Sequence, residues 1–287
     1  MKLIICKDMG SASIISGNEI KKNCIFFLKN PAKKFFEEKG IVSENLNKLE
    51  RAIIKCECVI TGTSWPVDIE YKAIKLAKKY NKKIITYLDH WVNYLERFNK
   101  NKNMLPDIII TTDKKAFKLA KKKFPLKKIL YKKNMYLENL KKKYKNLKKD
   151  KKYILYLDNH LIDVQNNIIN NKKKFGHNEK SIFENFVKNI HKHKLKSKKI
   201  LIRVHPKKKE RNILYITKKF SSICKISKNK DLIKDIAKSE IVVGWNSMAM
   251  YIAHKLGKKV MHILPRDFKD NILPIKNILY LEKNEKN

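Results

Sequence analysis

Residues 198–211 read KKILIRVHPKKKER and residues 239–264 read SEIVVGWNSMAMYIAHKLGKKVMHIL, and these two stretches decide the fold. They hold short apolar runs rich in β-branched residues, at 200–204, 241–243 and 259–264, which are typical of buried strands. A helical pattern lies between the second and third runs. The order strand, helix, strand predicts an α/β fold with a parallel sheet.

Chemically active side chains follow two of these strands. The first strand stops at His205 and Pro206, because proline cannot continue a central strand. The second stops at Gly244, and Ser247 then stands where an N-cap belongs, before a helix that ends at Gly257. Open parallel sheets bind ligands at the carboxyl edge of their strands, so we expect a binding site around His205 and Ser247.

The rest of the chain repeats this alternation. Residues 138–152 are lysine-rich and are interpreted as a linker, or else a solvated helix, and residues 166–178 are predicted to form a loop. We therefore predict two Rossmann-like, doubly wound parallel-sheet domains facing a cleft, at residues 1–145 and 146–287. Further strands are predicted at 2–6, 23–28, 57–62, 83–88, 107–112, 129–131, 153–157, 222–226 and 277–281, and helices at 31–40, 46–55, 68–80, 114–124, 180–193 and 231–238.

The charge of the chain is extreme, because 68 basic and 27 acidic residues give a net charge of +41. Such a charge suits nucleic acid or an anionic membrane. Nearly all of it is lysine, however, and Lys, Asn and Ile are abundant while Gly and Ala are scarce, as an AT-rich coding sequence would produce without selection. A nucleic-acid partner is therefore not expected. An anionic membrane surface stays open as a partner, because each lysine near such a surface adds ~1 kcal/mol of attraction.

Several protein classes are excluded by the sequence. No apolar run reaches the ~18–20 residues that a membrane span needs. Lys7 and Asp8 interrupt the first apolar run, so the N-terminus is interpreted as a strand and not as a signal peptide. The five cysteines lack a zinc or redox spacing and indicate a reduced, cytoplasmic protein. Neither a GxGxxG fingerprint nor a DxD motif nor a ligand cluster is present, so we expect neither a cofactor nor a metal.

Arginine is rare in this lysine-rich chain and occurs only at positions 51, 97, 203, 211 and 266. A retained arginine suggests a site that needs the planar fork of the guanidinium group. This is a hypothesis for Arg97, Arg203 and Arg266, and chance placement is its alternative.

The order of motifs over residues 153–265 resembles the carboxyl-terminal half of GT-B glycosyltransferases. It is most similar to the bacterial families with an HP motif and a following Ser motif: sialyltransferases, polysialyltransferases, capsule Kdo transferases and CDP-glycerol glycerophosphotransferases. In those families the His and the hydroxyl of the Ser motif contact the phosphate of a cytidine nucleotide donor. The resemblance implies this role for His205 and Ser247, with Pro206 fixing the turn. Several relatives carry paired hydroxyls, whereas Met248 follows Ser247 here.

The physical chemistry of a phosphate leaving group suits these positions. A helix that begins at Ser247 offers free N–H groups and a partial positive charge. His205 would stabilise the departing phosphate by donating a hydrogen bond, as would Arg203 if its side chain reaches the site. The structural alternatives are an ordinary N-cap and a histidine with partners at a strand end. The remaining positions expected to line the donor site are Asp158, His160, Gly244 and Asn246.

The general base of such transferases usually lies in the amino-terminal domain and takes a proton from the acceptor hydroxyl. The acidic motif of the family is not clearly present, and Asp89 is the best candidate because it directly follows a predicted strand. In the alternative interpretation Asp89 only caps a helix whose core stripe is Trp91, Tyr94 and Phe98. Other candidate bases are Glu70, Asp68 and Asp8. The residues expected to approach the acceptor from loops are Gly10, Ser11, Gly62, Thr63 and His90.

The sequence thus predicts an inverting, metal-independent glycosyltransferase. Its partners would be a nucleotide sugar, most simply a CMP-linked acid sugar, and a glycan or glycolipid acceptor. It would build a bacterial surface polysaccharide in the cytoplasm, at the inner membrane face. The alternatives are glycerophosphate transfer from CDP-glycerol, a basic α/β protein that binds nucleic acid, and a GT-B domain that binds a nucleotide without catalysis.

Overall fold

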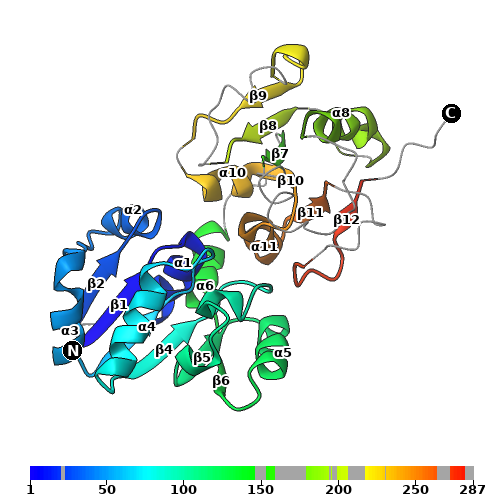
Figure 1. Ribbon diagram of the computed structural model, residues 1–287. Coiled ribbons are helices and arrows are strands. Elements are labelled where there is room, and N and C mark those ends of the chain that lie inside the picture. The colour runs from blue at the N-terminus through cyan, green and yellow to red at the C-terminus, as the bar shows by residue number, and fades with distance from the viewer. Residues whose placement is uncertain are drawn as a thin grey trace. The chain divides into compact units, whose positions relative to one another are not determined.

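The computed structural model describes residues 1–20, 23–145, 153–158, 179–193, 195, 199–205, 217–229, 231–263 and 272–281. These residues form two compact units, Met1–Leu140 and Lys141–Asn287. Each unit is built on a six-stranded sheet whose neighbouring strands are all parallel (Figure 1). The prediction of two Rossmann-like parallel-sheet domains is confirmed.

The sheet of unit 1 has the strand order β2-β1-β3-β4-β5-β6. The chain first adds a strand on one side of β1 and then continues on the other side, so the topological switch point lies between β1 and β3. The strands are β1 (Lys2–Cys6), β2 (Cys24–Leu28), β3 (Cys58–Thr61), β4 (Lys83–Tyr87), β5 (Ile108–Thr111) and β6 (Lys128–Tyr131). The helices are α1 (Met9–Asn18), α2 (Ala32–Glu37), α3 (Leu49–Lys55), α4 (Ile69–Lys79) and α5 (Lys114–Lys123), with 3-10 turns η1 (Leu46–Lys48), η2 (Glu96–Phe98) and η3 (Lys102–Met104). Helix α6 (Met135–Tyr144) begins in unit 1 and ends in unit 2.

Both faces of this sheet are covered, as the continuous apolar strands predict. Side chains alternate between the faces, so Leu3 and Ile5 join one core while Ile4 and Cys6 join the other. The first core includes residues of α3 and α4, and the second includes residues of α1 and α2. Buried polar side chains lie at or just beyond the carboxyl ends of the strands, at Thr61, Thr63, Thr86, Asp89 and Thr111.

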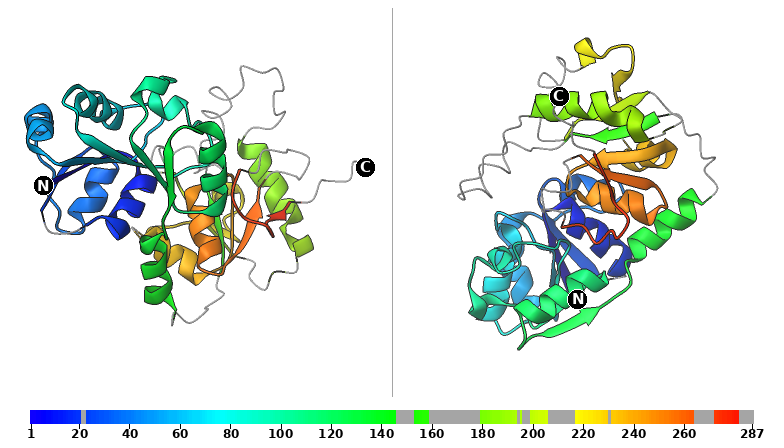
Figure 2. Two further views of the ribbon diagram at one scale, coloured as in Figure 1. Left: turned by 90° about the horizontal axis from the view of Figure 1, so that it is seen from below. Right: turned by 90° about the vertical axis from the view of Figure 1, so that its right-hand side faces the viewer.

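The sheet of unit 2 has the order β12-β11-β10-β7-β8-β9, with its switch point between β7 and β10. In Figure 2 the strands of this sheet are coloured from green for β7 and β8 through yellow and orange to red for β12. The strands are β7 (Tyr153–Leu157), β8 (Ile200–Arg203), β9 (Cys224–Ile226), β10 (Ser239–Gly244), β11 (Lys259–His262) and β12 (Leu279–Tyr280). The helices are α8 (Glu179–Asn189), α10 (Leu232–Lys238) and α11 (Met248–Lys255), with the 3-10 turn η4 (Ile190–His193).

The structure decides between two pairs of local alternatives. The stretch from residue 138, interpreted as a linker or else a solvated helix, is helical as far as Tyr144, and Leu137 and Leu140 of this helix are buried. The segment after β4 is not a helix with an aromatic stripe. It consists of turns with the two short 3-10 turns η2 and η3, and Asn93 and Asn99 adopt positive φ angles of 57° and 54° that interrupt any helix. The loop predicted at 166–178 lies outside the described residues.

All five cysteines are free thiols, and Cys6, Cys58 and Cys224 are buried within strands. Burial raises the pKa of each of these three thiols. Among the described residues no helix is both long enough and apolar enough to cross a bilayer.

Candidate functional site

Each unit presents its polar groups where the topology predicts a ligand. The crevice beyond the carboxyl ends of the strands, at the switch point, is where open α/β sheets bind ligands. In unit 1 this point follows β1 and β3, and in unit 2 it follows β7 and β10. We call these two places the unit 1 half-site and the unit 2 half-site, and each is described by itself.

The unit 2 half-site contains the predicted helix start. Ser247 is the N-cap of α11, and its Oγ accepts a hydrogen bond from the N–H of Met250 at 3.3 Å. The cap uses the N–H of Met250, whereas the N–H groups of Met248 and Ala249 precede the first hydrogen bond of the helix and can serve an anion. Helix formation at Ser247 was predicted and is confirmed.

The turn before Ser247 is shaped by two other predicted residues. Asn246 has a positive φ of 41°, which Asn tolerates better than most residues, and its Oδ1 accepts a hydrogen bond from the N–H of Ile272 at 3.1 Å. A Cβ on Gly244 would lie 3.2 Å from Leu157 and from the sulfur of Met250. Gly244 and Asn246 therefore position the helix end, and their contact with a donor stays a prediction.

Asp158 and His205 lie at the same edge as Ser247. Asp158 directly follows β7, is buried, and donates its backbone N–H to the carbonyl oxygen of Arg203 at 2.9 Å. His205 lies two positions beyond β8 and is half-buried. Because β8 and β10 flank β7, these two strands lie about 10 Å apart, and a ligand shared by His205 and Ser247 would have to lie over the end of β7. Pro206 and His160 lie outside the described residues.

Arg203 uses its fork within unit 2. Its Nη1 donates to Asp235 Oδ2 at 2.9 Å and to the carbonyl oxygen of Asn229 at 2.6 Å. Asp235 is buried and also accepts hydrogen bonds from Ser227 and from the Asn229 side chain. These contacts hold the segment between β9 and α10 in place. They give this arginine a structural role that does not require a nucleotide-sugar substrate.

The unit 1 half-site is organised by a buried ion pair. Arg97 Nη1 lies 3.3 Å from Asp89 Oδ1, and both residues are only 8% exposed. Thr63 donates its hydroxyl to the same Oδ1 at 2.9 Å and accepts from Arg97 at 3.1 Å. Arg97 also donates its Nε–H to the carbonyl oxygen of Val92. Asp89 Oδ1 is thus fully engaged, whereas no hydrogen bond to Oδ2 occurs within the described residues.

Two glycines make this arrangement possible. A Cβ on Gly10 would lie 2.2 Å from Asp89 Oδ2, and a Cβ on Gly62 would lie 2.3 Å from Ser11 Oγ. Gly10 and Ser11 were predicted to lie in a loop, but they belong to the first turn of α1, and Ser11 is completely buried. This correction follows from packing, because glycine at both positions lets α1 approach the strand ends closely.

His90 completes the group beside Asp89. Its Nδ1 is buried and has no hydrogen-bond partner among the described residues. Burial lowers the pKa of His90 to about 4, and the neighbouring Arg97 acts in the same direction. The imidazole is therefore neutral near pH 7 and can exchange a hydrogen bond with a ligand without carrying charge.

Glu70, one of the other candidate bases, connects two loops of this half-site through hydrogen bonds. It is 3% exposed, and its two carboxylate oxygens accept from the Ser64 hydroxyl at 2.9 Å and from the Lys7 N–H at 2.7 Å. Burial raises the pKa of Glu70 to about 7. Asp68, another candidate base, instead forms ion pairs with the ammonium groups of Lys7 and Lys29 at 2.7 and 2.6 Å. Glu70 therefore ties together the loops that follow β1 and β3.

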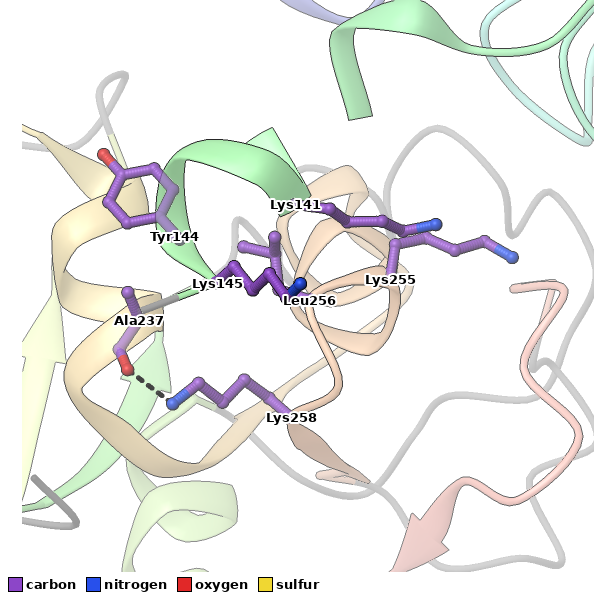
Figure 3. Close-up of a pocket in the computed structure, with 7 residues that line it drawn as sticks. All are labelled: Lys141, Tyr144, Lys145, Ala237, Lys255, Leu256 and Lys258. Carbon is purple, nitrogen blue, oxygen red and sulfur yellow. Dashed lines mark hydrogen bonds between the residues drawn. The ribbon is translucent and has the colours of Figure 1, made fainter. Parts of the chain in front are cut away.

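A pocket of about 210 Å³ lies elsewhere in unit 2 (Figure 3). Lys258 donates its ammonium group to the carbonyl oxygens of Ala237 and Ser239 at the end of α10. The pocket lies at the carboxyl ends of α10 and α11, where lysines complement the partial negative charge of helix ends. We assign no substrate to it. Its lining residues are Lys141, Tyr144, Lys145, Ala237, Lys255, Leu256 and Lys258.

Among the residues that the structure describes, no group of three or more His, Cys, Asp or Glu side chains is arranged to hold a metal ion.

Comparisons with known proteins identify the fold. The UDP-GlcNAc 2-epimerase of Neisseria meningitidis, solved with UDP-GlcNAc bound, is 13% identical with a TM-score of 0.58, covering 91% of this chain and 82% of that chain. A variant of the wall teichoic acid polymerase TagF is 14% identical with a TM-score of 0.53, covering 98% and 77%. A glycosyltransferase from Rickettsia africae is 14% identical with a TM-score of 0.53, covering 91% and 78%. No family model and no curated protein matches the chain.

These likenesses extend over most of the chain and concern its fold. The protein therefore has the GT-B fold of two Rossmann-like domains, as predicted from the motifs of its second half.

Proposed function

We propose that the protein is a glycosyltransferase that takes its sugar from a nucleotide-activated donor, with the donor phosphate bound at the unit 2 half-site. The observation that carries this proposal is the start of α11 at the switch point between β7 and β10, capped by Ser247. Free helix N–H groups are preorganised donors for a phosphate oxygen. The neighbour from Neisseria meningitidis, which was solved with UDP-GlcNAc bound, supports a nucleotide-linked ligand.

Two side chains would act on the reaction. His205 would donate a hydrogen bond to the departing phosphate and stabilise the negative charge that develops on it. Asp89 would take the proton of the acceptor hydroxyl through Oδ2, since Oδ1 is held by Thr63 and Arg97. Direct attack of that hydroxyl on the anomeric carbon breaks the bond to the phosphate in one displacement and inverts the configuration. The N–H groups and His205 would stabilise the negative charge of the leaving group without a bound metal.

The finer assignment is a CMP-linked acid sugar as donor and a bacterial surface polysaccharide or glycolipid as product. It rests on the resemblance to the HP-motif transferases. Transfer of glycerophosphate from CDP-glycerol is the second candidate, and the fold likeness to TagF, a wall teichoic acid polymerase, favours it. Both candidates place the cytidine nucleotide at the same half-site, so the base of the nucleotide is the first property to determine.

A thermal-shift panel with CMP, CDP, UMP, UDP, GDP and a short DNA tests the proposal. A nucleotide that binds only the folded state at about 100 times its Kd should raise the melting temperature by about 5–10 °C. His205→Ala should weaken the effective nucleotide about 10–100-fold, because a hydrogen bond to a charged group is lost.

His191→Ala is the matched control, because His191 is an exposed histidine of the same unit, and it should leave the shift unchanged. A shift with UDP or GDP alone would keep the transferase and reject cytidine. Stabilisation by DNA only, fading with salt and unaffected by His205→Ala, would overturn the proposed function.

A further inference from the structure

The corner of unit 1 between α5 and β6 has an unusual composition. Residues 114–133 contain ten lysines and no acidic residue, so this segment carries ten positive charges in twenty positions. β6 is the last strand of the sheet, and α5 lies along it, with the rings of Phe117 and Tyr131 in edge contact at 6.3 Å. The segment is thus an ordered, strongly cationic edge of the molecule.

The turn between α5 and β6 exposes an apolar side chain in the middle of this charge. Leu126 is 97% exposed, and Pro125 beside it is also exposed. Phe124 and Ile129 on either side of the turn are buried in the core, whereas Leu126 between them lies on the surface. We call the turn and the lysines around it the Leu126 surface. Its residues are Lys121, Lys122, Lys123, Pro125, Leu126, Lys127 and Lys128.

The lysines of this surface are available to an external anion. Lys122, Lys123 and Lys128 are exposed and form no ion pair within the described residues. Lys121 stands over the ring of Phe117 at 4.8 Å, which leaves its ammonium group at the surface. The nearest acidic residues along the chain are Asp113, which caps α5, and Glu138, which pairs with Lys133.

We propose that the Leu126 surface docks the protein on an anionic lipid bilayer. The lysines would lie at the level of the anionic head groups, and Leu126 would enter the boundary between head groups and acyl chains. Positive charge around an apolar apex is the combination that interfacial membrane binding uses. A polyphosphate chain such as nucleic acid would also attract the lysines, but it offers nothing to a leucine side chain.

The Leu126 surface is separate from the unit 1 half-site. The turn precedes β6 and so lies at the amino edge of the sheet, whereas Asp89, Glu70 and Thr63 lie at or near the carboxyl edge. Variants of the surface can therefore be tested without disturbing the candidate site, and membrane docking can fail while the proposed transferase activity holds, or the reverse.

Co-sedimentation of the full chain with large unilamellar vesicles tests the proposal. The protein should partition onto vesicles of phosphatidylglycerol and phosphatidylcholine, and much less onto phosphatidylcholine alone. Changing Lys121, Lys122 and Lys123 together to Gln should lower the partition coefficient about a hundredfold, since each lysine contributes a factor of about five. Leu126→Ser should lower it about tenfold, because an apolar side chain leaves the bilayer.

Two matched controls separate the surface from the general charge of the protein. Changing Lys72, Lys75 and Lys78 on α4 together to Gln removes the same charge from another helix and should have little effect, because exposed charges beyond about 10 Å are screened. Val42→Ser removes another exposed apolar side chain, 82% exposed, and should also have little effect. Melting curves of all four variants check that each is folded.

Three results would overturn the proposal. The first is the absence of binding to anionic vesicles. The second is an equal loss of binding in the α4 variant, which would show that total charge alone acts. The third is normal vesicle binding by Leu126→Ser, which would reduce the surface to a polyanion site, and binding of a short DNA by that variant would then identify the alternative.

Discussion

The two half-sites differ in the kind of group that each presents. In unit 1 the carboxyl edge is lined by acidic side chains held by buried partners, as Asp89 is held by Arg97 and Thr63. In unit 2 the start of a helix lies at the switch point, so this half-site presents backbone N–H groups. Their strand orders also differ, since two strands precede the switch in unit 1 and three do in unit 2.

This difference teaches how one fold separates two chemical tasks. Backbone donors at a helix start cannot be titrated and suit a phosphate of fixed charge. A carboxylate suits proton transfer, but its position must be fixed by other side chains, which requires burying an ion pair. The first task thus depends on topology, and the second on the contacts of a few side chains. The predictions below test that division, in order of decreasing effect.

The largest effect is expected for Asp89→Asn. Turnover of the nucleotide sugar identified by the thermal-shift panel should fall about 10²–10⁴-fold, because the amide cannot accept the proton. The thermal shift caused by the nucleotide alone should stay unchanged, because that ligand is assigned to unit 2. Both quantities are measured on the same preparations.

Asp113→Asn is the control for Asp89→Asn. Asp113 follows the next strand, β5, and caps α5, a task that Asn performs equally well. Full turnover in Asp89→Asn would remove the base from this position and direct attention to Glu70. Loss of the nucleotide shift in the same variant would contradict the division of tasks between the units.

Glu70→Gln should change the pH dependence of stability by about 3 kcal/mol. Because the pKa rises from its ordinary value of 4.5 to about 7, the folded state keeps a proton that the unfolded state has released between these pH values. This group therefore destabilises the wild type progressively as pH rises through that window, by about 3 kcal/mol in full. The glutamine variant lacks this loss, so its stability relative to the wild type should increase from pH 5 to pH 8.

Urea denaturation of both proteins at pH 5 and pH 8 measures this difference. The difference between proteins is needed because His90, whose pKa is lowered to about 4, contributes the opposite slope below its ordinary value of 6.5. Glu38→Gln, at an exposed position, should run parallel to the wild type. Parallel curves for Glu70→Gln would show that the buried carboxyl does not titrate near neutral pH.

The smallest effect is expected for Ser247→Ala. Loss of the cap should cost about 1 kcal/mol and lower the melting temperature of unit 2 by about 2–4 °C. It should also weaken nucleotide binding, because the start of α11 is the assigned phosphate site. Asp231→Ala removes the cap of α10 with a similar loss of stability and should leave nucleotide binding intact. Equal binding by both variants would make Ser247 an ordinary cap.

Much of the fold could be predicted from short-range patterns in the sequence. The apolar run at 200–204 became β8. Gly244 leads into a turn, Ser247 caps α11, and Gly257 follows the end of that helix, as the sequence predicted. These features depend on neighbours along the chain, so they are visible in one sequence. The end of α6 was left open between a linker and a solvated helix, because its lysines conceal the buried Leu137 and Leu140.

The contacts of the unit 1 half-site could not be predicted in the same way. The cluster of Asp89, Thr63 and Arg97 joins segments that come together only in the folded sheet. The burial of Glu70 also depends on packing, since its place at the start of α4 looks like an exposed first turn. The useful signal was the rarity of arginine, because Arg97 and Arg203 each pair with one buried carboxylate and also donate hydrogen bonds to other oxygen atoms.

The buried thiols make local opening measurable in each unit. A thiol reacts as its thiolate, and burial withholds both that form and the access of reagent from Cys6 and Cys224. Labelling of these side chains must wait until β1 or β9 opens, so its rate reports the opening free energy of one strand at a time. Cys6 lies in one unit and Cys224 in the other. Their labelling rates therefore show which unit opens more readily and in which unit a bound nucleotide slows the opening.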